Sequence, residues 1–135
     1  MKPNLEEALR SLRLADRDIT VFDVLKSVSD VHVSMICFHA QQAVEKSLKA
    51  VLYQYLIEFE RTHDLVKLAK LLRNQGIVPP IPDDDLRKLN PFAVTFRYDD
   101  TEIERLSREE AATIVSAMRQ WAGEQIEKSC TPEEE

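Results

Sequence analysis

Residues 34–59, SMICFHAQQAVEKSLKAVLYQYLIEF, constrain the fold of this chain more than any other stretch. They contain no Gly and no Pro and are rich in Ala, Leu, Glu, Lys and Gln, so their length and helix propensity predict one long helix. At the helical repeat, the apolar and small residues fill one wide arc: Ile36, Cys37, Ala40, Ala43, Val44, Ser47, Leu48, Ala50, Val51, Leu52 and Tyr55. An arc this wide predicts neighbouring elements on both of its sides.

The polar residues of this stretch divide into two groups. The first group recurs at helical spacing on the side opposite the arc and is expected to face solvent: His39, Gln42, Lys46, Lys49 and Tyr53. In the second group, Gln41 points into the arc and Glu45 lies at its margin, where an amide or carboxylate is stable only if it is hydrogen-bonded. Gln41 therefore either ties a neighbouring helix or loop into the core, or marks a polar cleft or the surface of a symmetric partner.

The segments on either side of this stretch also read as helices. Residues 4–27 carry apolar side chains at intervals of three and four, which predicts an amphipathic helix. The join at 29–32 is short, and short connections favour an antiparallel helical hairpin. Further on, Thr62 as an N-cap and Gly76 as a stop predict the limits of a short third helix.

The second half of the chain adds two more helical segments. The prolines within 77–82 predict an extended linker, because proline cannot continue a helix. A fourth apolar stripe covers 86–96, where Pro91 is expected to kink or restart the helix. Ser107 and Glu110 have the spacing of a capping box at the start of a last helix. The fold class predicted from these segments is all-α, an up-down bundle of about five helices.

Length and charge limit the possible functions. With 135 residues, the chain is long enough for one hydrophobic core, and we expect a single domain over 1–130 followed by a disordered acidic tail at 131–135. The net charge of −6 argues against binding of duplex DNA by phosphate neutralisation, although a local basic cleft is still compatible with it. No apolar run is long enough to span a bilayer and the N-terminus is highly charged, so we expect a cytoplasmic protein without membrane contact.

The strongly specific catalytic motifs are missing from the sequence, and neither a metal site nor a cofactor is predicted. His39 and His63 can each act as a general base or as a hydrogen-bonding residue of the structure. Arg97-Tyr98-Asp99-Asp100 places a guanidinium beside a phenol and two carboxylates, which is suited to recognising phosphate. The alternative is an Arg–Asp pair that closes the fourth helix.

Three blocks carry a resemblance to a known family: Phe38 to Ala50 (FHAQQAVEKSLKA), Thr62 to Leu65 (THDL), and Arg97 to Asp100 (RYDD). In residues, order and spacing they resemble the HEPN family, the higher eukaryote and prokaryote nucleotide-binding domain, and in particular the branch with an Arg-Tyr-Pro-Asp block. The resemblance implies an all-α bundle of about five helices and a homodimer. It also implies a minimal nucleotidyltransferase as the partner protein, in a pair of the toxin–antitoxin type.

Many HEPN proteins are metal-independent ribonucleases in which an Arg precedes a His by four to six residues at the dimer cleft. In this chain no His follows Arg97 at that distance, and His63 follows Arg61 by only two residues. Asp99 also replaces the Pro of the related block. A ribonuclease would therefore lack its usual proton carrier, and the resemblance favours binding over catalysis.

The leading hypothesis is a nucleotide or RNA phosphate bound in the dimer cleft. In it, Arg97 contacts the phosphate, Tyr98 stacks or hydrogen-bonds, and Asp100 orients Arg97. Four further residues are expected to add charge and hydrogen bonds to the site: Lys46, Lys49, His39 and His63. Three polar residues are expected to line the cleft or the interface: Gln41, Gln42 and Glu45.

Two alternatives and one modification accompany this hypothesis. The chain can be an endoribonuclease that uses His39 or His63 with Arg97 across a dimer, or a structural dimeric partner without a ligand. The resemblance further suggests that a partner nucleotidyltransferase adenylylates the hydroxyl of Tyr98.

Overall fold

The computed structural model describes residues 3–93 and 106–130, and every regular element within them is helical. In chain order the elements are α1 (Pro3–Leu25), α2 (Val33–Gln54), α3 (Leu65–Arg73), α4 (Asp83–Leu89), the 3₁₀ helix η1 (Asn90–Ala93) and α5 (Arg108–Cys130). The predicted all-α bundle of about five helices is therefore confirmed. The segment that contains Arg97 and the acidic tail lie outside the described residues.

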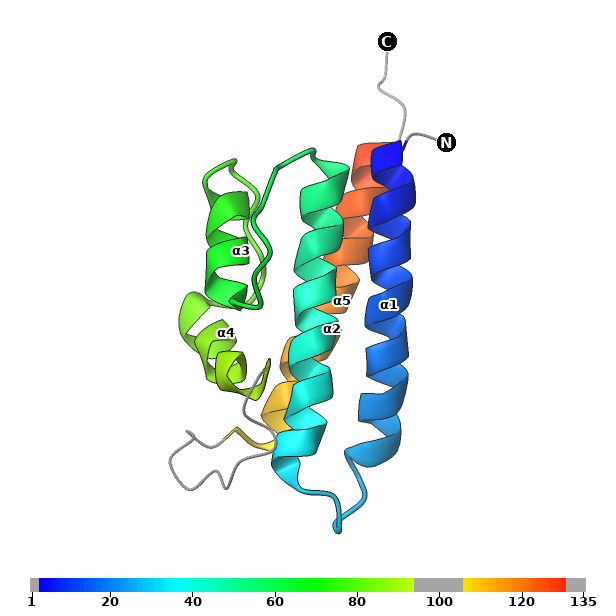
Figure 1. The fold of residues 1–135 in the computed structure, drawn as a ribbon, viewed down its shortest axis with the longest axis vertical. Coiled ribbons are helices and arrows are strands. Elements are labelled where there is room, and N and C mark those ends of the chain that lie inside the picture. Colours follow the sequence, from blue (N-terminus) through cyan, green and yellow to red (C-terminus); the bar gives the residue numbers. More distant parts are fainter. Residues whose placement is uncertain (1–2, 94–105, 131–135) are drawn as a thin grey trace.

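Helices α1, α2 and α5 lie side by side along the bundle (Figure 1). At one end, the Asn4 side chain donates to the carbonyl of Gln54, and the Gln54 amide donates to the Ser129 hydroxyl. At the other end, the Arg108 guanidinium donates to the carbonyl of Val31 in the α1–α2 turn. Helix α1 is therefore antiparallel to α2, as the hairpin prediction requires, and α5 runs in the same direction as α2.

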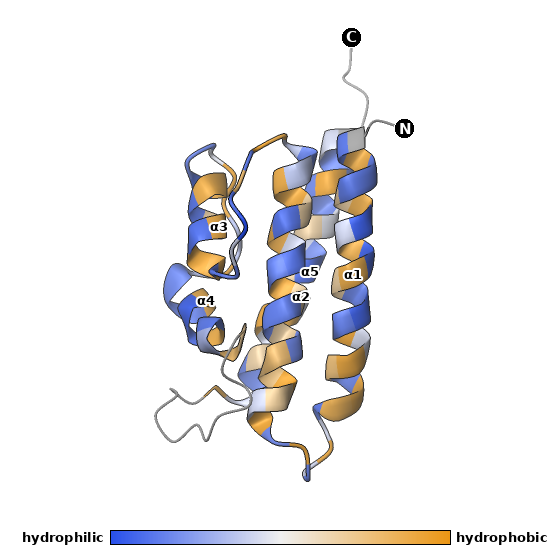
Figure 2. Cartoon of the chain, viewed as in Figure 1, coloured by the Kyte–Doolittle hydropathy of each residue, from blue (hydrophilic) through white to orange (hydrophobic). Residues whose placement is uncertain are grey.

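Helix α2 is the centre of the core. Its apolar arc is covered by α1 and α5 on one side and by α3, α4 and η1 on the other (Figures 1 and 2). Ile36, Leu48 and Leu52 are completely buried, and each such side chain contributes about 2 kcal/mol to the free energy of unfolding. Cys37, also predicted in the arc, is buried among them.

Helix α2 ends at Gln54, and the prediction of one helix over 34–59 is wrong for its last five residues. Leu56 adopts a left-handed conformation with φ of 58°. The backbone N–H of Ile57 then reaches back to the carbonyl of Leu52 at 2.9 Å, while that of Leu56 reaches the carbonyl of Tyr53 at 3.1 Å. This pair of bonds is a Schellman motif, which glycine usually forms.

The reason for the early end lies in tertiary packing. Beyond the motif, Ile57 and Phe59 are partly buried against the core instead of continuing the helix into solvent. The segment 55–64 thus turns back along α2 and leads into α3. Helix propensity favours continuation, but burial of these side chains offsets both that preference and the strain at Leu56.

The ends of α3 correct one detail of the prediction and confirm another. The N-cap of α3 is Asp64 rather than Thr62, and its carboxylate accepts from the backbone N–H of Val66 at 3.0 Å. Thr62 accepts from the N–H of Asp64 and so supports the cap. Gly76, with φ of 80°, follows the end of α3 as predicted.

Helix α4 starts at Asp83, so that Asp83–Asp85 form its first turn ahead of the apolar stripe predicted over 86–96, and its α-helical part ends at Leu89. Pro91 lies in η1, so the helix restarts in 3₁₀ form where a break was expected. Ser107 and Glu110 exchange the two hydrogen bonds of a capping box, at 3.0 and 2.9 Å, which confirms the start of α5.

Candidate functional site

A buried carboxylate at the middle of α2 organises the first polar cluster. One oxygen of Glu45 accepts hydrogen bonds from Gln41 Nε2 at 3.1 Å and from His63 Nδ1 at 2.9 Å. The other oxygen accepts from Lys49 Nζ at 2.8 Å. The Glu45 side chain is 4% exposed, whereas His63 is 57% exposed. Glu45 therefore holds an imidazole and an ammonium at the boundary between core and solvent.

Gln41 extends this cluster into the loop before α3. Its Nε2 also donates to the carbonyl of His63 at 3.0 Å, and its Oε1 accepts from Gln42 Nε2 at 2.7 Å. The side chain of Gln41 is completely buried. Of the two interpretations given for Gln41, the structure supports the first, because the amide ties a neighbouring loop into the core.

The protonation of the cluster follows from these contacts. Burial is the largest single influence and raises the pKa of Glu45, but hydrogen bonds from Lys49, His63 and Gln41, together with the charge of Lys49, outweigh it and bring the pKa below its ordinary value of 4.5. An ionised carboxylate is an acceptor, so Nδ1 of His63 carries the shared proton. When the imidazole is neutral, its lone pair is then on Nε2.

A second carboxylate, Asp18 of α1, organises the other polar cluster. It accepts from His39 Nδ1 at 3.1 Å and from Lys46 Nζ at 2.5 Å. Both partners lie on the polar side of α2, as predicted, but they are partly buried. The sequence pattern did not single out Asp18. The hairpin offered a signal for one of these contacts, since Asp18 precedes the end of α1 by about as many residues as His39 follows the start of α2.

In both clusters, the positive charge of the lysine is paired with a carboxylate. The ammonium of Lys46 is paired with Asp18, and that of Lys49 is paired with Glu45. Each positive charge is thus offset locally by a carboxylate. Neither lysine supplies a free positive charge for a phosphate, and any such charge has to come from an additional residue.

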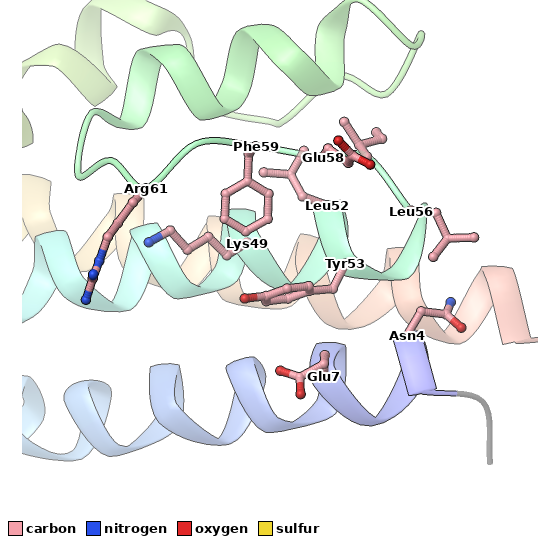
Figure 3. A pocket seen from close by; sticks show the side chains of 10 residues that line it. Asn4, Glu7, Lys49, Leu52, Tyr53, Leu56, Glu58, Phe59 and Arg61 are labelled. Atoms are coloured by element: carbon pink, nitrogen blue, oxygen red, sulfur yellow. The ribbon is translucent and has the colours of Figure 1, made fainter.

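Next to the first cluster, a groove with a volume of about 910 Å³ opens between α1, the end of α2 and the segment that follows it (Figure 3). Tyr53 and Phe59 meet edge to face, with ring centroids 5.3 Å apart. Lys49 Nζ lies 5.9 Å from the Phe59 ring centroid, and the exposed Arg61 also lines the groove. Sequence reasoning missed this groove because it placed Phe59 within the long helix.

Arg97, Tyr98, Asp99 and Asp100 lie outside the described residues, so the roles assigned to them stay predictions. Within the two described ranges, no group of three or more His, Cys, Asp or Glu side chains is arranged to hold a metal ion. Burial raises the pKa of Cys37 to about 11, and a thiol in that state is a poor nucleophile at neutral pH.

Comparison with known proteins agrees with this architecture. The HEPN domain family matches residues 4–125, so the chain belongs to the HEPN domain family. A crystal structure described as an archaeal HEPN homologue superimposes with a TM-score of 0.57 at 20% identity, over 90% of this chain and 97% of the other. At that identity the likeness establishes the shared fold. No functionally curated protein matches the sequence.

Among the described residues, none of the helices combines the length and apolar character that crossing a bilayer requires.

Proposed function

We propose that this HEPN domain is a binding subunit that holds a nucleotide or an RNA phosphate in the cleft of a homodimer. In this proposal it acts in the cytoplasm as one half of a toxin–antitoxin-type pair, and its partner is a minimal nucleotidyltransferase. The observation that most supports ligand binding is the Glu45 cluster. A buried carboxylate keeps His63 and Lys49 in fixed positions beside solvent, which lowers the entropic cost of contacting a ligand.

The Glu45 cluster needs a further cation to attract phosphate. Lys49 is neutralised by Glu45, so the proposal assigns the net attraction to Arg97, with Asp100 orienting its guanidinium. Tyr98 stacks on a base or donates a hydrogen bond. Lys46 and His39, held by Asp18, have a secondary role on the neighbouring face of α2.

Isothermal titration of the purified full chain with nucleotides and short RNA tests this assignment. Arg97→Ala is expected to weaken binding about tenfold or more, because a charge-assisted contact is lost. Arg87→Ala is the matched control, since Arg87 is an exposed arginine that pairs with Asp84 within α4. Equal affinity of the wild type and Arg97→Ala would remove Arg97 from the site.

The partner and the modification have separate tests. Light scattering of the purified chain should give the mass of a dimer, and a co-expressed minimal nucleotidyltransferase should co-purify with it. Mass spectrometry of the co-expressed chain should show an added nucleotide on Tyr98. If no mass is added, adenylylation at Tyr98 is rejected without affecting the binding proposal.

A second candidate function, metal-independent cleavage of RNA, is favoured by one specific observation. His39 and His63 each have Nδ1 on a carboxylate, an arrangement that orients an imidazole for acid–base catalysis. Cleavage should then be lost in the double variant His39→Ala and His63→Ala, and should not depend on added divalent metal. Cleavage that persists in the double variant would exclude both histidines as catalysts.

A further inference from the structure

The groove beside the Glu45 cluster combines three kinds of chemistry within one space of about 910 Å³. Its middle is aromatic, one end is cationic, and carboxylates stand on opposite walls. This volume falls in the range of about 300 to 1,000 Å³ that is typical of small-molecule sites. The groove is built from three segments that are far apart in sequence, namely the start of α1, the end of α2 and residues 56–61.

The aromatic middle consists of Tyr53 and Phe59. Both side chains are partly buried, and their edge-to-face contact fixes the two rings relative to each other. Leu52, which is completely buried, also lines the groove. Flat rings held in this way offer a surface on which a nucleobase can stack.

The cationic end is formed by Lys49 and Arg61, which lie next to each other in Figure 3. Lys49 is fixed by its contact with Glu45 and by its position over the Phe59 ring. Arg61 is exposed, and its guanidinium can bind a phosphate in bidentate fashion. Because Lys49 is already neutralised, Arg61 supplies the net positive charge at this end.

Carboxylates of Glu7 on α1 and Glu58 on the opposite wall line the groove away from Arg61 (Figure 3). Both side chains are exposed. Carboxylates accept hydrogen bonds from ribose hydroxyls and from base amino groups, and they repel phosphate. Their placement therefore favours one orientation, with the sugar and base toward the carboxylates and the phosphate toward Arg61.

From this distribution we infer that the groove binds one nucleotide unit, with its base against Tyr53 and Phe59 and its phosphate at Arg61. The inference rests on the proposed function of nucleotide binding and deepens it by assigning a site made of residues other than the Arg97 block. A free mononucleotide and the 5′ end of an RNA strand present the same chemistry to these side chains.

Titration of the full chain with adenosine 5′-monophosphate, adenosine and ribose 5-phosphate tests the inference. The complete nucleotide should bind about tenfold more tightly than either part, because it uses both the ring surface and the cation. Phe59→Leu keeps the apolar packing but removes the flat ring, and should weaken nucleotide binding about tenfold. Arg61→Ala should do the same for the nucleotide and leave the affinity for adenosine unchanged.

The control variant is again Arg87→Ala, and circular dichroism checks that each variant is folded. If ribose 5-phosphate binds as tightly as the nucleotide, or if neither Phe59→Leu nor Arg61→Ala changes nucleotide binding, the groove assignment is overturned. A 5′-phosphorylated RNA tetramer tests the second possible ligand, the 5′ end of an RNA strand. The groove assignment holds whichever of the two ligands binds more tightly, provided that Phe59→Leu and Arg61→Ala weaken it.

Arg97→Ala separates this inference from the proposed function. Nucleotide binding that depends on Arg61 and Phe59 but not on Arg97 supports the groove and removes the Arg97 assignment. RNA binding that depends on Arg97 but not on Arg61 or Phe59 leaves the proposed function standing and overturns the groove. A wild-type chain that binds neither nucleotide nor RNA contradicts both.

Discussion

The two carboxylate clusters on α2 use the same chemistry in different surroundings. Glu45 and Asp18 each hold one histidine Nδ1 and one lysine Nζ. The Glu45 side chain is 4% exposed and also accepts from Gln41, whereas Asp18 is 13% exposed and joins the surfaces of two helices. Glu45 thus connects α2 to the loop before α3, which has no helical hydrogen bonds to hold it in place. Asp18 joins α1 to α2, and these two helices already share an apolar interface.

Because of this difference in burial, the two clusters should contribute unequally to the free energy of unfolding, although their contacts are similar. Removing an ion from a buried, fully hydrogen-bonded site leaves its partners without compensation, which is costly. Removing one from a partly exposed site lets the partners turn to water. Predictions about the two clusters therefore rank by burial rather than by the number of contacts.

The largest effect is expected for Glu45→Ala. The substitution leaves Gln41 with an unmet donor and frees Lys49 and His63, so the free energy of unfolding should fall by about 3 kcal/mol. Urea denaturation followed by circular dichroism measures this loss. If Asp18→Ala costs as much as Glu45→Ala, burial is not what separates the two clusters.

A pH titration sharpens the same contrast. Because the pKa of Glu45 lies below its ordinary value of 4.5, ionised Glu45 stabilises the fold above that value, and this stabilisation is lost as the pH falls through the lower folded pKa. Glu45→Gln cannot titrate at this position. The stability gap between wild type and Glu45→Gln should therefore shrink as the pH falls below about 4.5. A gap that grows on acidification would contradict the sign of the shift.

Leu56→Gly tests the segment that the Glu45 cluster anchors. Leu56 is 76% exposed and has φ of 58°, so replacing it by glycine relieves strain while removing few contacts. The variant should be more stable by about 1 kcal/mol. Thermal unfolding measures the gain, and Leu56→Ala, which keeps a Cβ, is the control that should lack it.

The smallest effect is expected for Asp18→Ala, at about 0.5 kcal/mol. Asp18 lies within α1, where alanine has the higher helix propensity and offsets part of the lost pairing. Raising the salt concentration should reduce the difference further, because partly exposed ion pairs are screened. Denaturation at low and high salt measures both values, and an increase of the difference with salt would contradict the interpretation of the Asp18 contacts as partly exposed ion pairs.

Much of the fold was predictable from local signals. The apolar arc of α2, the stop at Gly76 and the capping box at Ser107 each depend on residues close in sequence, so their chemistry is visible in the sequence. The end of α2 was not predictable, because Leu56 gives no local signal for a left-handed turn. Its conformation is imposed by the burial of Ile57 and Phe59 against the core.

The candidate site shows the same division. The need of Gln41 and Glu45 for polar partners followed from their positions in the helix, but the identity of one partner, the His63 backbone, depends on where the loop lies. The groove with Phe59 and Arg61 was not predicted for the same reason. Its walls come together because the chain reverses direction after α2, and that reversal was not visible in the sequence.

By itself, the sequence determined an all-α chain with one central helix, the face of that helix that is buried, and the polar residues on it that require partners. Helical periodicity and the cost of burying polar groups are enough for these conclusions. Tertiary structure decided where α2 stops, which carboxylate holds which lysine, and that aromatic and cationic side chains share a groove. These features depend on contacts between segments distant in sequence, and such contacts are selected by the packing of the whole bundle.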